Sequence, residues 1–172
     1  MKSAKFPLIR SSKQTNDELK YKSLTLILDT SYNPEVHARA WGYMVADYKD
    51  LKRGDKVYTH YLTFSDANLL GDDVYTTNYQ MIFCAVRDGE IIMINDYNLI
   101  EIVEEKQKDS IIIQNKKIST TRGIIKHSGT SQVKAGDEVI FREIGSYKET
   151  IEGTEVYVCE TQDLLAKVSP TT

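Results

Sequence analysis

Three histidines are the side chains of this protein best suited to acid–base chemistry near neutral pH. His37, His60 and His127 are scattered along the chain, and none belongs to a recognisable serine–histidine–aspartate arrangement. The sequence has no nucleophile-elbow motif and no glycine-rich phosphate loop. We therefore predict that the protein has no catalytic residues and is not an enzyme. A hydrolase that uses a cleft lined by some of the eleven tyrosines is a weaker alternative.

Metal-binding patterns are equally weak. The carboxylates of Asp66, Asp72 and Asp73 lie close in sequence, but their spacing is not that of a twelve-residue calcium loop. Cys84 and Cys159 each stand alone in an apolar run, so there is no paired-cysteine zinc or redox motif. We predict two buried, reduced thiols, with a disulfide as the alternative. We further predict no metal, no cofactor and a cytoplasmic location.

Composition limits the partners and the size of each domain. The chain has 172 residues, a net charge of -3 and a pI near 5.7, which does not favour nucleic acid or an anionic membrane. We find no apolar run long enough to span a membrane and no continuous apolar core of a signal peptide. The length fits one ordinary domain or two small ones.

Repeated motifs indicate two similar small domains. The segment Leu51–Tyr58 (Leu-Lys-Arg-Gly-Asp-Lys-Val-Tyr) returns as Val133–Ile140 (Val-Lys-Ala-Gly-Asp-Glu-Val-Ile). Further downstream, Asp88–Ile94 is similar to Glu152–Val158, and Asn98–Val103 is similar to Asp163–Val168. These matches predict about 18 extra residues in the first copy, between Tyr58 and Asp88.

The Gly-Asp pair in each copy predicts a tight turn in front of a strand. Glycine supplies a permissive backbone, and the aspartate carboxylate can accept hydrogen bonds from nearby amides. We therefore predict that Gly54, Asp55, Gly136 and Asp137 are structural turn residues.

The elements that hold these turns are predicted to be short strands rich in Ile, Val, Tyr and Thr, with no long helix. The first strands are expected near Leu26 and Ile112. The predicted fold class is all-β, with two tandem, small, partly open β-barrels. The expected domains are a flexible N-terminal segment at 1–20, a first barrel at 21–104 with an insertion at about 63–79, and a second barrel at 105–172. Residues 104–109 form the charged linker.

The second copy resembles the chaperonin-10 family, the GroES-like lids of chaperonins. The resemblance is carried by Thr121–Ile125 (Thr-Arg-Gly-Ile-Ile), by Val133–Phe141 around the Gly-Asp turn, and by Glu155–Val168 with its closing Asp-Leu-Leu-Ala-Lys-Val. The resemblance implies GroES-like barrels and a protein that acts without chemistry. In that family, subunits form a ring, usually of seven, and each inserts a mobile loop with an aliphatic tripeptide into a chaperonin ring.

Some of the family's parts are expected to be missing. The predicted connection Ile113–Thr121 is too short for a mobile loop, and Asp29–Arg39 is longer, but neither carries an aliphatic tripeptide. The hairpin that forms the roof in the family has no counterpart. Residues Leu69, Leu70 and Val74 of the expected insertion are predicted to bind the partner instead. The alternative is that these leucines cover the core.

These observations lead to one main functional hypothesis. We predict a co-chaperonin-like protein that caps a GroEL-like chaperonin ring and assists ATP-dependent folding. We expect it to form a homo-oligomer through exposed strand edges. The alternative is a non-catalytic binding or assembly module, such as a phage or accessory structural protein, that kept the barrel and lost chaperonin docking.

Overall fold

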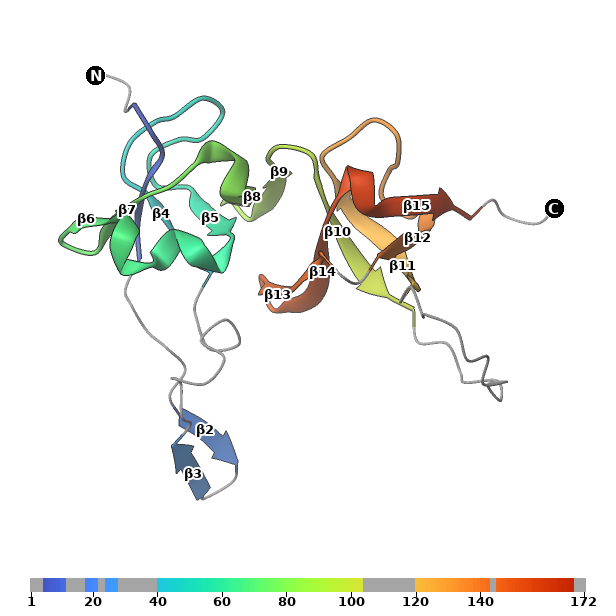
Figure 1. The fold of residues 1–172 in the computed structure, drawn as a ribbon, viewed down its shortest axis with the longest axis horizontal. Coiled ribbons are helices and arrows are strands. Elements are labelled where there is room, and N and C mark those ends of the chain that lie inside the picture. The colour runs from blue at the N-terminus through green and yellow to red at the C-terminus, as the bar shows by residue number, and fades with distance from the viewer. Residues whose placement is uncertain are drawn as a thin grey trace. The chain divides into compact units, whose positions relative to one another are not determined.

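The structure is a computed structural model that describes residues 5–11, 18–21, 24–27, 40–103, 120–142 and 145–168. Within these residues the regular structure consists of β-strands and four short 3-10 helices, without an α-helix (Figure 1). The predicted all-β fold class is therefore confirmed. Short runs of branched and aromatic residues form the strands because such side chains fit a pleated, half-buried surface.

The chain divides into two compact units, Met1–Ile92 and Met93–Thr172. The sheet of the first unit has seven strands, in the order β6 (Leu69–Gly71), β7 (Val74–Thr76), β1 (Leu8–Arg10), β4 (Trp41–Met44), β5 (Lys56–Thr59), β8 (Ile82–Arg87) and β9 (Glu90–Met93). Three 3-10 helices connect its strands: η1 (Tyr61–Phe64), η2 (Asp66–Asn68) and η3 (Tyr79–Met81). A separate hairpin of β2 (Glu18–Tyr21) and β3 (Leu24–Ile27) lies between β1 and β4 in the sequence.

The sheet of the second unit has six strands. Their order is β13 (Tyr147–Ile151), β14 (Thr154–Glu160), β10 (Tyr97–Ile102), β11 (Thr120–Ser128), β12 (Glu138–Arg142) and β15 (Leu164–Lys167). The 3-10 helix η4 (Thr161–Asp163) precedes β15, as η3 precedes β8.

The two sheets share one strand order. Strands β1, β4 and β5 pair in sequence order in the first sheet, as β10, β11 and β12 do in the second, and every pairing is antiparallel. Strand β7 lies beside β1 as β14 lies beside β10, and β8 lies beside β5 as β15 lies beside β12. The first sheet has one further strand, β9, on the outer side of β8.

The pairing register agrees in detail. Thr59 lies opposite Ile82, with a register shift between Tyr58 and Thr59. Phe141 lies opposite Leu164, with the same shift between Ile140 and Phe141. Thr59 precedes Phe141 by 82 positions, and Ile82 precedes Leu164 by the same number. Tyr75 also precedes Tyr157 by 82 positions. The shared irregularity shows that the correspondence extends to individual residues.

This correspondence differs from the one that the sequence motifs predict. The expected insertion at about 63–79 is wrong, because β6 and β7 lie within it and hold the places that β13 and β14 hold in the second sheet. The turn at Asp88–Gly89 resembles Glu152–Gly153 in sequence, but the counterpart of Glu152–Gly153 in the sheet is the turn at Asp72–Asp73. Two-residue turns of this kind join any pair of adjacent antiparallel strands, so they do not identify a strand's place in the sheet.

The expected domain limits also change. The predicted linker at 104–109 lies outside the described residues, and the units divide between Ile92 and Met93, before β10. The expected flexible segment at 1–20 is wrong for Leu8–Arg10, because β1 is an interior strand and Ile9 is fully buried. Of the predicted first strands, the one near Leu26 is β3, which among the described residues pairs only with β2, and the one near Ile112 lies outside the described residues.

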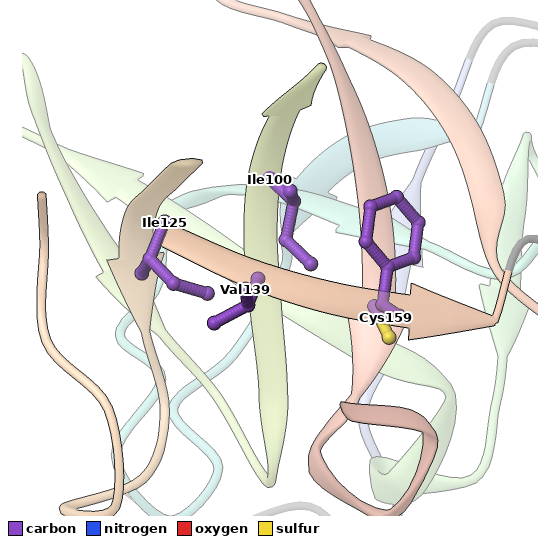
Figure 2. Packing of buried hydrophobic residues seen from close by; sticks show 5 residues of the cluster. Ile100, Ile125, Val139 and Cys159 are labelled. Carbon is purple, nitrogen blue, oxygen red and sulfur yellow. The ribbon is translucent and has the colours of Figure 1, made fainter. Parts of the chain in front are cut away.

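Buried aliphatic and aromatic side chains form the core of each sheet. In the second unit, the fully buried cluster consists of Ile100, Ile125, Val139, Phe141 and Cys159, and Figure 2 shows these side chains converging from β10, β11, β12 and β14. The corresponding place in the first unit holds Ile9 and Val57, both fully buried. Burial of each such side chain contributes about 1.5–3 kcal/mol.

Candidate partner-binding site

The connection between the first two strands of each unit is longer than the sequence motifs predict. In the first unit, β1 ends at Arg10 and β4 begins at Trp41, so 30 residues join them. In the second unit, β10 ends at Ile102 and β11 begins at Thr120, so 17 residues join them. The bounds expected for these connections, Asp29–Arg39 and Ile113–Thr121, do not hold because β1 and β10, rather than the segments near Leu26 and Ile112, are the first strands.

Both connections carry three aliphatic residues in a row. The first contains Leu26-Ile27-Leu28 and the second contains Ile111-Ile112-Ile113. Leu28 and residues 111–113 lie outside the described residues and are placed here by sequence alone. The prediction that the connections lack an aliphatic tripeptide is therefore wrong.

A sequence signal for the true first strands does exist. Phe6-Pro7-Leu8-Ile9 enters β1 and Tyr97-Asn98-Leu99-Ile100 enters β10, so each has an aromatic residue two positions before a Leu-Ile pair. The match is only four residues long, and β1 itself has only three. It is therefore weaker than the apolar runs around Leu26 and Ile112.

The Gly-Asp pairs occupy equivalent turns. Gly54 and Gly136 have φ angles of 88° and 93°, in the left-handed region that favours glycine. Asp55 accepts a hydrogen bond from the amide of Lys52 at 2.8 Å, and Asp137 accepts one from the amide of Lys134 at 2.9 Å. The two turns lead directly into β5 and β12, and these hydrogen bonds fix their backbone conformation.

Each turn aspartate also has a cationic partner. Arg87 contacts Asp55 at 2.6 Å, and Lys167 contacts Asp137 at 2.8 Å. Burial by itself would raise the pKa of Asp55, but the hydrogen bonds from Arg87 and Lys52 hold that pKa below 3.8. The hydrogen bond from Lys167 lowers the pKa of Asp137. Each carboxylate thus links its turn to another strand, Asp55 to β8 through Arg87 and Asp137 to β15 through Lys167.

The predicted partner-binding residues lie on the hairpin of β6 and β7. Leu69 is 42% exposed and Leu70 is 63% exposed, whereas Val74 is half-buried. The leucines therefore do not cover the core. Leu62 in η1 is also exposed, at 50%, and its carbonyl accepts a hydrogen bond from Asn68, the residue before Leu69.

The described histidines do not converge on other reactive groups. His60 accepts a hydrogen bond from the amide of Leu62 at 3.2 Å, which caps η1, and its burial lowers its pKa. His127 lies in β11, and His37 lies outside the described residues. In the described part of the chain no group of three or more His, Cys, Asp or Glu side chains could hold a metal ion.

Comparison with known proteins gives a partial match to a family model. The family model described as "Chaperonin 10 Kd subunit" matches residues 90–168, which include every strand of the second sheet. The matched region is less than half of the chain. No curated protein matches the sequence. Among the described residues, no helix is long and apolar enough to cross a membrane.

Proposed function

We propose that the protein is a co-chaperonin that binds and caps a GroEL-like chaperonin ring and assists ATP-dependent protein folding without doing chemistry itself. The observation that carries this proposal is the match of residues 90–168 to the chaperonin 10 kDa family, which covers the whole second sheet. The first sheet has the same central strand order and the same register shift. We therefore propose that the first unit is a second GroES-like module and that the chain is a tandem duplication.

The docking elements in this proposal are the two long connections. Leu26-Ile27-Leu28 and Ile111-Ile112-Ile113 occupy the connections between first and second strands, where the family carries its aliphatic tripeptide. Burial of one such side chain contributes about 1.5–3 kcal/mol, so a single contact is weak. Two connections on one chain raise the effective concentration of the second contact once the first has formed.

The proposal also includes self-association through a strand edge. In the first sheet, β9 pairs along the outer side of β8. The counterpart of β8 is β15, which is an edge strand of the second sheet among the described residues, and its Leu165 is 44% exposed. An edge of this kind offers unpaired backbone groups to another strand. We propose that a second copy of the chain covers it.

The reduced cysteines agree with this assignment. Cys84 and Cys159 are free and buried. Free thiols persist in reducing compartments, which supports the proposal that the protein acts in the cytoplasm, where chaperonin and ATP are both present.

Complex formation with a purified chaperonin ring tests the proposal. The full-length protein is mixed with a GroEL-like ring, with and without ATP, and the mass of the complex is measured in solution. The unmodified protein should form an ATP-dependent complex. The paired change Ile111→Asp with Ile113→Asp should weaken it, Leu26→Asp with Leu28→Asp should do the same, and all four changes should abolish it.

Thr150→Asp is a suitable control because Thr150 is exposed on β13, outside both connections. It should leave the complex unchanged. Failure of the unmodified protein to form any ATP-dependent complex would overturn the proposal and favour the assembly module. The mass of the protein alone, compared with that of Leu165→Asp, tests self-association: loss of the larger species in the variant is expected, and an unchanged mass contradicts the edge contact.

A further inference from the structure

A tight turn in the first unit has a lysine at a position that favours glycine. Tyr48 and Leu51 exchange two backbone hydrogen bonds of 2.9 Å, so Lys49 and Asp50 are the two central residues of the turn. Lys49 has a φ angle of 49°, in the left-handed region, whereas Asp50 does not have a positive φ. A two-residue turn with positive φ at its first central position favours glycine there. The backbone conformation therefore does not explain why this residue is a lysine.

The side chain of Lys49 lies over two tyrosine rings. Its Nζ atom is 4.4 Å from the centroid of the Tyr79 ring and 5.8 Å from the centroid of the Tyr48 ring. The two centroids are 5.6 Å apart, and the ring planes are inclined to each other by 48°. A cation within about 6 Å of a ring centroid is attracted by the negative face of the ring. The two rings thus hold an alkylammonium group in this structure, that of Lys49.

A carboxylate lies beside the two rings. The hydroxyl of Tyr79 donates a hydrogen bond of 3.4 Å to Oδ2 of Asp50, and burial, together with Asp50, raises the pKa of Tyr79. The phenol therefore stays protonated at neutral pH and keeps this hydrogen bond. We refer to Tyr48, Tyr79 and Asp50 as the ammonium site. Its ring faces attract an alkylammonium group, and its carboxylate adds Coulomb attraction.

The charges around the ammonium site are balanced. Arg87 donates a hydrogen bond of 3.0 Å to the carbonyl oxygen of Asp50, but its guanidinium is paired with Asp55 and is also attracted by Asp88. The segment Asp47–Asp55 contains three aspartates and three cationic residues. No excess of negative charge therefore attracts a strongly hydrated cation such as sodium. The ring faces instead favour a cation with an alkyl surface.

The equivalent positions of the second unit have no ring and no charge. With the offset of 82 positions that relates the two sheets, the counterparts of Tyr48, Lys49 and Tyr79 are Thr130, Ser131 and Thr161. The short helices η3 and η4 begin at Tyr79 and Thr161, which supports this alignment. A unit of this topology thus does not need the ammonium site in order to fold.

We infer that the ammonium site binds the alkylammonium group of a ligand, and that Lys49 occupies the site when this ligand is absent. The cation of the ligand takes the place of the Lys49 Nζ atom over the rings, and the exposed Lys49 side chain turns into solvent. Quaternary and methylated ammonium groups are the cations that aromatic sites of this kind recognise. Small amines and methylated lysine side chains of proteins both carry such a group. The inference does not depend on chaperonin binding.

Calorimetric titration of the full-length protein tests this inference. The two probes are tetramethylammonium chloride and a short peptide with one trimethylated lysine, and the control is sodium chloride at the same concentration. Binding of a probe but not of sodium is expected. Tighter binding of the peptide would identify a protein as the source of the ligand, and equal or weaker binding of the peptide would identify a small amine. If neither probe binds, the inference is overturned.

Lys49→Gly distinguishes a ligand site from a structural contact. The variant removes the competing ammonium group and places glycine at the positive φ. It should raise the affinity for tetramethylammonium about two- to fivefold, because the contact of Lys49 with the rings no longer has to be broken. Ser131→Gly, at the counterpart position of the second unit, is the matched control and should leave the affinity unchanged. If Lys49 only stabilises the turn, Lys49→Gly should bind the probe no better than the unmodified protein.

Variants of the rings complete the test. Tyr48→Leu and Tyr79→Leu should each lower the affinity about fivefold or more, because each removes one ring face. Tyr79→Phe should retain most of the affinity, since it keeps the ring and loses only the hydrogen bond to Asp50. Circular dichroism and thermal melting verify that each variant is folded. Unchanged affinity in both leucine variants would show that the cation binds elsewhere and would overturn the inference.

Discussion

Arg87 and Asp55 are joined by two hydrogen bonds, from Nε to Oδ1 at 2.9 Å and from Nη2 to Oδ2 at 2.6 Å. Asp55 is only 4% exposed, and it also accepts the amide hydrogen bond of Lys52. The pair connects the end of β8 to the Gly-Asp turn that precedes β5. Two parallel bonds between guanidinium and carboxylate give this contact a defined geometry.

Replacement of Asp55 should destabilise the first unit. Asp55→Asn removes the charge that Arg87 and the Lys52 amide contact, and we expect a loss of about 1–3 kcal/mol in the free energy of unfolding. Denaturant unfolding measures this loss. Asp137→Asn is the matched control in the second unit and should cost less, because its partner Lys167 is about half exposed. An equal loss for both variants would contradict the role assigned to burial.

The same carboxylate should make stability depend on pH. The folded-state pKa of Asp55 lies below 3.8, the value expected when the chain is unfolded. Its stabilising contribution is therefore fully present above 3.8 and is lost as the pH falls through the folded-state pKa. The difference in melting temperature between the unmodified protein and Asp55→Asn should accordingly be constant near neutral pH and shrink in acid. If the difference in melting temperature grew in acid instead, the pKa of Asp55 would have to be higher in the folded state than in the unfolded state, contrary to this prediction.

Gly42 and Gly123 should not tolerate a side chain. A Cβ on Gly42 would lie 2.6 Å from the carbonyl oxygen of Arg10, and one on Gly123 would lie 2.8 Å from that of Glu101. Each would also contact an isoleucine side chain, Ile9 or Ile100. We expect Gly42→Ala and Gly123→Ala to cost about 1–3 kcal/mol each, measured by denaturant unfolding. Ile124→Ala, at an exposed position beside Gly123, is the control, and a smaller loss for either glycine variant than for this control would argue against the close packing.

Phe141 should contribute more to the free energy of unfolding than Thr59, its counterpart in the first unit. Its fully buried ring packs against Tyr157, with centroids 5.7 Å apart, and 82 positions earlier the chain has Thr59. Phe141→Ala should cost about 3–5 kcal/mol, because it leaves a cavity in the core. Thr59→Ala should cost about 1 kcal/mol, mainly through the hydrogen bond to the His60 carbonyl. Calorimetry measures both losses of stability. Similar losses for Phe141→Ala and Thr59→Ala would mean that the core of the second unit repacks to fill the space left by the truncated side chain.

The two thiols should react only after unfolding. Cys84 and Cys159 are fully buried, and burial raises the pKa of the Cys159 thiol to about 11. The reactive thiolate is therefore scarce at neutral pH, and reagents cannot reach the sulfur. We expect alkylation of both cysteines to be slow in the native protein and complete in denaturant, as measured by mass spectrometry. Rapid native labelling of either cysteine would contradict the burial.

Local patterns were sufficient for part of this fold. The alternation of branched residues predicts the all-β class, and Val-Lys-x-Gly-Asp-x-Val predicts a turn followed by a strand because glycine at positive φ and a short carboxylate act within a few residues. Leu69 and Leu70 are exposed, so local patterns did not decide whether these leucines cover the core. The docking role of these residues remains a prediction, and that of the long connections remains a proposal.

The order of strands depended on residues far apart in sequence. Leu8–Arg10 has three residues and no strong local signal, yet it is an interior strand because β4 and β7 supply partners on both sides. The run Leu24–Ile27 has a stronger strand pattern, yet of the strands that the structure describes it pairs only with β2. Sequence alone thus determined that the chain is built from short strands and Gly-Asp turns, since those preferences are local. Tertiary structure decided which strands begin each sheet, and hence which aliphatic residues lie in the connections, since a strand's place depends on pairing with distant residues.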